Sequence, residues 1–329
     1  MKLPKIIGDT WFNLPSDKQA LISADFADKI VLVDFWTYSC INCLRTLPYL
    51  QDWWEKYKDK NFLLIGIHTP EFEFEKNTEN VKKAIKDLGV DWPVVLDNDY
   101  LNWNNFANHY WPAKYLADRK GNIVYEHFGE GEYTKTEQKI VELLANGNLR
   151  QMPKVENVEH HHGAFCFSSK SQGSAKQVLI PTPETYCGFT RGKLANSQGF
   201  RENEVFEYKL PENLSDNEIA LSGSFLATEE FVQSSKIGAS LYLSFKATEV
   251  NLILASADKE AVIEVKLNDE LPELEIRGTN VDELGEVKIT QPTMYNLIKS
   301  KDLVTGILKI TSLKGRFQAY AFTFSGCTD

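Results

Sequence analysis

The first half of the chain alternates short apolar runs with segments of helical periodicity. Apolar runs of this length predict strands buried on both faces of a sheet, here at about 30–36, 62–67, 94–96 and 113–116. Between the runs, apolar residues recur at helical spacing, which predicts helices at about 44–57, 78–88, 101–109 and 136–145. Strands that alternate with helices predict an α/β domain with a mainly parallel sheet.

From about residue 178 onward, the pattern changes to short β-rich runs without helices between them. The runs lie at 218–228, 240–247, 249–255, 261–267, 286–290, 306–311 and 316–325. Many short strands separated by turn residues predict an all-β sandwich domain, jelly-roll-like in form.

A polar stretch without periodicity separates the two patterns. It contains His160-His161-His162, and its composition is typical of an inter-domain linker. We therefore predict a first domain over 1–150, a linker over 151–175 and a β domain over 176–329. The histidine tract is interpreted as a solvated part of the linker, with metal binding as the alternative.

Composition and charge narrow the class of protein. The chain has 329 residues, of which 43% are hydrophobic and 25% charged, and its formal net charge is −10. These values predict a soluble globular chain of about two domains, and the acidic balance argues against nucleic acid or an anionic membrane as a partner. No apolar run is long enough to span a membrane, and residues 1–4 lack the apolar core of a signal peptide. We expect either a cytoplasmic chain or a processed or excised soluble part.

Two of the five cysteines suggest a chemistry. Cys40 and Cys43 form a Cys-x-x-Cys motif directly after the strand at 30–36 and directly before a predicted helix. In this context the motif indicates a redox dithiol, because a helix N-terminus favours the thiolate that attacks disulfides. Half of a zinc site is the alternative, but it needs two further ligands and there is no second Cys-x-x-Cys. The other cysteines are Cys166, Cys187 and Cys327. We interpret them as three buried free thiols, or as one disulfide bridge plus one free thiol.

Several neighbours of the dithiol are candidate site residues. Asp34 stands inside an apolar strand, where burial would raise the pKa of its carboxyl and suit it to exchange a proton with Cys43. Glu71 follows the second apolar strand and is expected either to tune the thiols or to be a solvated loop acid. Tyr38 and Trp111 are expected to form an apolar wall for substrate, with core packing as the alternative.

Pro112 is a further candidate. It follows Trp111 and precedes a strand, 113–116, that pairs with 123–125 in a predicted hairpin. We interpret Pro112 as bordering the dithiol and shaping a groove where backbone pairs with an extended substrate segment. An ordinary turn proline is the alternative.

These elements together resemble the thioredoxin superfamily. The segments 33–36 and 40–43, then Pro48 and Pro112, follow its pattern in order and spacing. A closer resemblance is to the TlpA-like thiol–disulfide oxidoreductases, and among them to the soluble C-terminal part of the DipZ family. The segments that carry it are 36–43, 67–72 and 110–116, and it continues through 182–186 and 319–324.

The resemblance implies both a fold and an activity. The fold is a thioredoxin-like domain followed by a carbohydrate-binding-module-like β domain. Cys40 would attack a substrate disulfide, Cys43 would resolve the mixed disulfide, and Pro112 would be cis. No cofactor is expected beyond the Cys40–Cys43 disulfide, and no metal.

The same resemblance implies a cellular setting. The role would be reductive, in extracytoplasmic thiol maintenance or cytochrome c biogenesis, at a periplasmic or cell-envelope location. The implied partners are disulfide-bearing protein substrates, a membrane electron donor of the CcdA type and, for the β domain, carbohydrate.

The chain also departs from the thioredoxin pattern. Ser39 stands where thioredoxins usually have Trp, Ile41-Asn42 replaces Gly-Pro, and Trp111 is bulky beside the expected cis proline. These positions border the substrate in the family, so they bear on substrate choice and redox potential. Two rival functions stay open: a metal-binding chaperone that uses the dithiol, and a glycan- or protein-binding module with its activity in the β domain.

Overall fold

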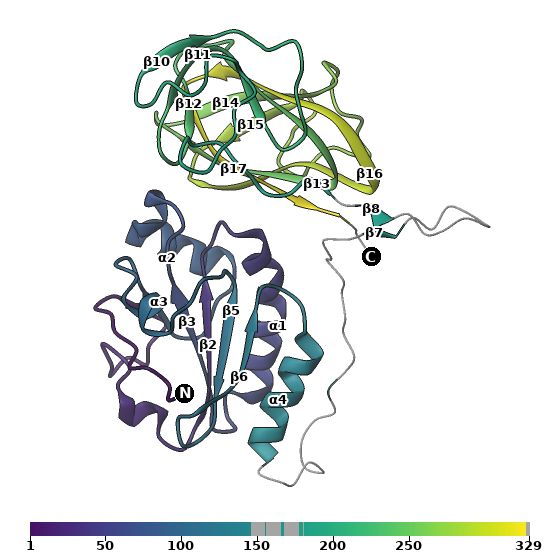
Figure 1. The fold of residues 1–329 in the computed structure, drawn as a ribbon. Helices are drawn as coiled ribbons and strands as arrows, with labels where there is room; N and C mark the ends of the chain where they lie inside the picture. Colours follow the sequence, from purple (N-terminus) through teal and green to yellow (C-terminus); the bar gives the residue numbers. More distant parts are fainter. Residues whose placement is uncertain (146–154, 156–165, 168–177, 180, 327–329) are drawn as a thin grey trace, which may run out of the picture. The chain divides into compact units, whose positions relative to one another are not determined.

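A computed structural model describes residues 1–145, 155, 166–167, 178–179 and 181–326. The chain divides into two compact units, Met1–His160 and His161–Asp329, each with its own core (Figure 1). The predicted linker, the histidine tract and Cys327 lie wholly or almost wholly outside the described residues. The fold class is confirmed: an α/β unit is followed by an all-β unit.

The first unit is built on a mixed sheet. Its strands are β1 (Trp11–Phe12), β2 (Ile30–Trp36), β3 (Phe62–His68), β4 (Val94–Leu96), β5 (Ala113–Ala117) and β6 (Ile123–Phe128), in the order β1-β4-β3-β2-β5-β6. Only β2, β3 and β4 pair in parallel, and β1, β5 and β6 join antiparallel. The expectation of a mainly parallel sheet is therefore wrong, because the hairpin after Pro112 adds two antiparallel strands at one edge.

Helices and chain segments cover both faces of this sheet. The helices are α1 (Ile41–Tyr57), α2 (Thr78–Asp87), α3 (Leu101–Asn105) and α4 (Tyr133–Ala145), with short 3₁₀ turns η1 (Ser23–Phe26) and η2 (Glu73–Lys76). Alternate residues of β2 point to opposite faces, as strand geometry requires. Ile30 and Leu32 join the core cluster that includes side chains of α1, α2 and α4, whereas Val31 and Val33 join the other cluster.

Three predicted helices differ from the observed ones by three residues or more, and the first of them, α1, begins at Ile41 instead of at 44. The predicted helix over 101–109 ends at Asn105, because Ala107 adopts a left-handed backbone with φ of 49° and turns the chain toward Trp111. The α4 helix begins at Tyr133, three residues before the predicted start at 136.

The second unit is entirely β in the residues described. Its main strands are β9 (Thr185–Tyr186), β10 (Val205–Tyr208), β11 (Ile219–Ala227), β12 (Val232–Ser234), β13 (Ser240–Ser256), β14 (Ala261–Leu267), β15 (Glu286–Ile289), β16 (Thr293–Lys314) and β17 (Phe317–Ser325). The strands β7 (Cys166–Phe167) and β8 (Val178–Leu179) form a separate pair. The runs predicted at 240–247 and 249–255 are one strand with a register shift between Ala247 and Glu249.

One continuous sheet curls around a single core in this unit. The first half of β13 lies between β11 and β16, so that Leu241 faces both Leu221 and Ile310. The second half lies between β17 and β16, so that Leu252 faces Phe322. These side chains all belong to one buried cluster. A long strand that changes partners along its length thus brings two layers of strands over one core.

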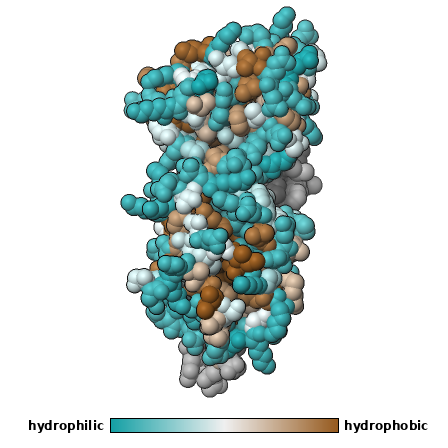
Figure 2. Space-filling model, turned by 90° about the vertical axis from the view of Figure 1, so that its left-hand side faces the viewer, coloured by the Kyte–Doolittle hydropathy of each residue, from teal (hydrophilic) through white to brown (hydrophobic). Residues whose placement is uncertain are grey.

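The surface agrees with the acidic, moderately hydrophobic composition. On the face shown in Figure 2, hydrophilic residues cover most of the surface and apolar residues form patches between them, which is normal for folded domains. Among the described residues, every helix is too short or too polar to cross a membrane.

Candidate active site

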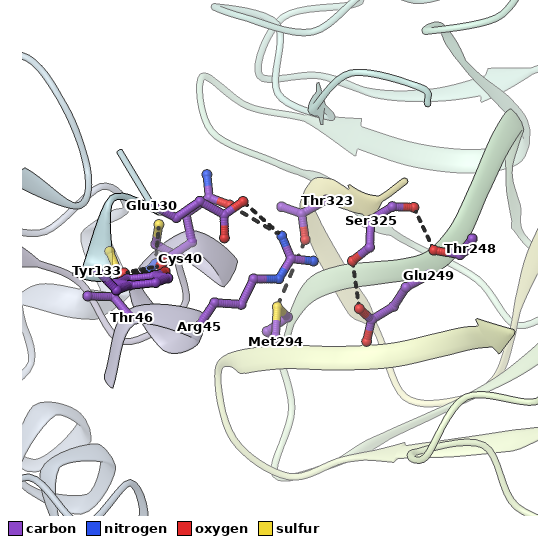
Figure 3. A network of polar contacts seen from close by, with 12 residues as sticks. Cys40, Arg45, Thr46, Glu130, Tyr133, Thr248, Glu249, Met294, Thr323 and Ser325 are labelled. Atoms are coloured by element: carbon purple, nitrogen blue, oxygen red, sulfur yellow. Dashed lines mark hydrogen bonds and ion pairs between the residues drawn. The ribbon is translucent and has the colours of Figure 1, made fainter. Parts of the chain in front are cut away.

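Cys40 and Cys43 stand at the start of α1 in different environments. Cys40 is the N-cap residue, and its Sγ accepts a hydrogen bond from the backbone N–H of Cys43 at 3.4 Å (Figure 3). Cys40 is partly exposed, whereas Cys43 is only 1% exposed. The unpaired N–H groups of a helix N-terminus favour negative charge, so the accessible sulfur is the one placed to carry it.

The buried thiol is held in its protonated form. Burial is the largest effect that raises the pKa of Cys43, followed by its hydrogen bond with Cys40 and the nearby charge of that sulfur. The carboxylate of Asp34 also raises it. Cys43 therefore needs a base before it can act as a nucleophile.

Asp34 is the buried carboxyl group whose charge acts on Cys43. It lies in β2, and burial raises the pKa of its carboxyl to about 7, against a smaller lowering by the charge of Lys114. Among the described residues, its Oδ1 has no hydrogen-bond partner. A carboxyl that titrates near neutral pH beside a buried thiol is suited to take up and return a proton.

Lys114 was not among the residues predicted from the sequence. It faces Asp34 across the β2–β5 pairing and is fully buried. Burial lowers the pKa of its ammonium, and the charges of Asp34, Cys43 and Glu130 raise it. The sequence does indicate that this lysine is buried, because the strand at 113–116 is predicted to be covered on both faces and so has no side open to solvent.

Two further charged residues, Glu130 and Arg45, lie next to the buried pair of Asp34 and Lys114. Glu130 follows β6, and its Oε1 lies 3.5 Å from Nη1 of Arg45 in α1 (Figure 3). Burial raises the pKa of Glu130, opposed first by Arg45 and then by Lys114. The charges of Asp34, Lys114, Glu130 and Arg45 thus alternate in sign from β2 outward.

The peptide bond between Trp111 and Pro112 is cis, as expected. The carbonyl oxygen of Pro112 accepts the N–H of Gly129 at 2.8 Å. The Trp111 indole N–H donates to the carbonyl of Thr69 at 3.0 Å, and its ring lies against Trp103 with centroids 4.1 Å apart. Trp111 keeps a partly exposed surface beside Pro112.

Two exposed aromatic residues adjoin this segment. Tyr110 is 54% exposed and Phe128 is 44% exposed, and their ring centroids are 5.3 Å apart. Phe128 pairs with Ala113, the residue after Pro112. The cis proline is therefore flanked by an aromatic surface that sequence reasoning missed.

The expectation that Tyr38 contacts substrate is wrong for this structure. Its side chain is only 4% exposed, because the ring stacks on His68 at 5.7 Å and meets the edge of Phe74 at 6.1 Å. Tyr38 is thus a core residue of the turn before Cys40, which was the alternative interpretation.

The acidic side chain that contacts the turn before Cys40 is that of Glu75, whereas the sequence suggested Glu71 for this role. Glu71 is partly exposed, and its backbone N–H donates to Oε2 of Glu75 at 2.6 Å. Glu75 is fully buried, and burial raises the pKa of its carboxyl to about 7. Its Oε1 accepts the hydroxyl of Ser39, the residue before Cys40, at 2.6 Å. A modulating role of the Glu71 side chain stays a prediction.

The remaining cysteines and histidines add no metal site among the residues described. Cys187 is a buried free thiol whose pKa burial raises, while Cys327 and the side chain of Cys166 lie outside the described residues. Nor do three or more His, Cys, Asp or Glu side chains cluster as metal ligands anywhere in the described part.

Each unit matches a known protein family. Residues 8–126 match the AhpC/TSA family, and residues 182–325 match a family described as a thioredoxin-like C-terminal domain. The chain is 33% identical over 326 residues to Protein DipZ of Mycobacterium tuberculosis (strain CDC 1551 / Oshkosh). That similarity covers 98% of this chain and 42% of DipZ, so the chain spans about two fifths of the length of this relative.

Two shorter proteins of Bacillus subtilis (strain 168) are similar to the first unit. The thioredoxin-like protein SkfH is 34% identical over 118 residues, which are 36% of this chain and 81% of SkfH. The thiol-disulfide oxidoreductase YkuV is 25% identical over 144 residues, which are 44% of this chain and 94% of YkuV.

Proposed function

Because the chain belongs to the thioredoxin-like thiol–disulfide oxidoreductases, we propose that Cys40 and Cys43 are its redox pair and that it acts as a reductase. The observation that carries the proposal is the contrast between the two thiols. The partly exposed Cys40 lies at a helix N-terminus, and the buried Cys43 interacts electrostatically with the Asp34 carboxyl, whose pKa is about 7.

The reaction has two exchange steps. The Cys40 thiolate attacks one sulfur of a substrate disulfide, so that the substrate S–S bond breaks and a Cys40–substrate disulfide forms. The other substrate sulfur leaves as a thiolate and takes a proton from solvent. Cys43 then gives its proton to Asp34 and attacks Cys40, which forms the Cys40–Cys43 disulfide and releases the second substrate thiol. The substrate gains two electrons, and the dithiol loses them.

The segment around Pro112 is proposed to hold the substrate. Trp111, Tyr110 and Phe128 offer aromatic surface beside the cis proline, and such surfaces favour apolar side chains of a partner. A protein substrate would present its disulfide in an extended segment over Pro112.

A reductive cycle needs an electron donor for the oxidised pair. We propose a donor dithiol in a membrane protein of the CcdA type and an extracytoplasmic setting, in thiol maintenance or cytochrome c biogenesis. The support is the similarity to DipZ over nearly the whole chain. Carbohydrate binding by the second unit stays a prediction.

Redox equilibration in graded glutathione buffers tests the proposal. The state of the pair is scored by mass after alkylation. A potential below about −220 mV places the protein with reductants, whereas one above about −180 mV indicates an oxidase or isomerase. A pair that forms no disulfide overturns the proposal and favours metal binding by the dithiol.

Two substitutions separate the roles of the cysteines. Cys43→Ser should accumulate mixed disulfides with protein substrates, because the first step proceeds and the second cannot. Cys40→Ser should abolish exchange. Full disulfide reduction by the Cys40→Ser protein would contradict the assignment.

A further inference from the structure

The turn before Cys40 is tied to the loop after β3 by a single buried carboxylate. Ser39 is fully buried, and its hydroxyl donates to Oε1 of Glu75 at 2.6 Å. The backbone N–H of Ser39 points to the same oxygen at 3.4 Å. The residue that directly precedes Cys40 is thus held through both its side chain and its backbone.

The other carboxylate oxygen holds the loop itself. Oε2 of Glu75 accepts the backbone N–H groups of Glu71 at 2.6 Å and of Phe72 at 3.0 Å. An aromatic contact runs beside this polar one, because Tyr38 meets the edge of Phe74. Two adjacent residues before the dithiol therefore dock on the segment that includes η2.

Every one of these polar partners is a donor, which suits an ionised carboxylate. Burial opposes ionisation and is the main reason that the pKa of Glu75 is raised to about 7; hydrogen bonds from Ser39 and Thr37 act against it, and the charge of Glu71 acts with it. His68, which faces Thr37 and Tyr38, is buried with a pKa lowered to about 3 and is neutral. A buried acid is costly unless its hydrogen bonds compensate.

We propose that Glu75 is a positioning residue for Cys40: by anchoring Ser39, it fixes the turn that places the Cys40 sulfur at the N-terminus of α1. The inference rests on the proposed function of the dithiol. It also gives Ser39 a role at a position where a thioredoxin usually has Trp, because the hydroxyl of this short side chain donates to the buried carboxylate. An anchored turn keeps Sγ of Cys40 within reach of the Cys43 N–H, which stabilises the attacking thiolate.

Three single variants and one double variant test the anchor. Ser39→Ala removes one oxygen atom and leaves the charge of Glu75, whereas Glu75→Gln keeps the shape and removes the charge. The matched control is Glu73→Gln in the same short helix, because the Glu73 side chain is 71% exposed and pairs with Lys76 at the surface. The readouts are the rate of Cys40 alkylation in the reduced protein at fixed pH and the potential of the pair in glutathione buffers.

Loss of the anchor should slow alkylation of Cys40 by about tenfold in Ser39→Ala, as expected for one charge-assisted hydrogen bond. Glu75→Gln should also slow it, and the double variant should be no slower than the slower single variant, because both changes remove one contact. The potential should shift in both single variants, and Glu73→Gln should match the wild type. A general loss of packing would not produce this coupling.

The result that overturns the inference is a wild-type rate and potential in Ser39→Ala. Additive effects of the two substitutions would also contradict it, since they would indicate independent roles. If Glu75→Gln does not fold, Ser39→Ala alone decides. Failure here is distinct from failure of the proposed function, because the latter shows as absence of a Cys40–Cys43 disulfide in the wild-type protein.

Discussion

Asp34 and Lys114 face each other across β2 and β5, and both side chains are buried. Among the described residues, Oδ1 of Asp34 and Nζ of Lys114 have no hydrogen-bond partner, yet the charge of each favours ionisation of the other. On its other side, Asp34 pairs with Gly66, which brings no side chain. The Asp34 carboxyl is thus balanced between burial, which favours its neutral form, and the charge of Lys114, which favours its charged form.

The first prediction concerns the resolving step. Asp34 can accept the Cys43 proton only when it is ionised, so the rate of resolution should rise with pH around the pKa of about 7. Asp34→Asn should remove this inflection and slow resolution by about a hundredfold, the lower end for general-base catalysis. Stopped-flow measurement of mixed-disulfide decay between pH 5 and pH 9 would check it. An unchanged inflection would assign the titration to another group, such as Glu75.

The stability of the fold should depend on the same group. Its pKa is about 7 in the folded protein, against an ordinary value of 3.8, so between these values the folded state binds more protons and stability falls as pH rises. Asp34→Asn should therefore be more stable than the wild type at pH 8, by up to about 4 kcal/mol. Urea denaturation at pH 4 and pH 8 measures the difference, which should nearly vanish at the lower pH. A constant difference at both pH values would contradict the assignment.

Lys114→Met should move the titration in a definite direction. The lysine charge lowers the pKa of Asp34, so its removal should raise that pKa and shift the midpoint of resolution to higher pH. At pH 7 the resolving step should be several-fold slower, because a smaller fraction of Asp34 is then ionised. The pH–rate profile checks the shift. A midpoint that moves to lower pH would show that Lys114 does not act through Asp34.

The parts of the site that were predictable from the sequence are local in the chain. A buried strand, an acid within it and a Cys-x-x-Cys before a helix lie within a short stretch, so the pattern alone places Asp34, Cys40 and Cys43 together. Glu75 was not predictable in this way, because its contact with Ser39 joins two loops that only the folded sheet brings together. Lys114 does not stand out in the sequence because lysine is usually solvent-exposed, although the apolar run around it predicts a strand with no exposed face.

In the second unit, too, the sequence does not reveal structure that depends on contacts between distant segments. The pattern predicted only 306–311 of the strand β16, which extends over Thr293–Lys314. Residues 299–305 are mostly polar and show no alternation, and their strand conformation comes from pairing with β13, as in the pair Ala247 and Val304. Pairing supplied by a neighbouring strand leaves little trace in the segment's own sequence.

The last prediction separates substrate binding from chemistry. Trp111 packs on Trp103 and bonds to Thr69 beside the cis proline, but it supplies no reacting group. Trp111→Ala should therefore raise KM for a protein disulfide such as insulin by about tenfold, as for an aromatic contact residue, with little change in kcat. A small disulfide, oxidised glutathione, serves as the control, because it has no large apolar side chain to place on the aromatic surface formed with Tyr110 and Phe128. An equal loss of kcat/KM with both substrates would show that the substitution damages the dithiol itself. Trp111 would then be a structural residue of the loop and not part of the substrate surface.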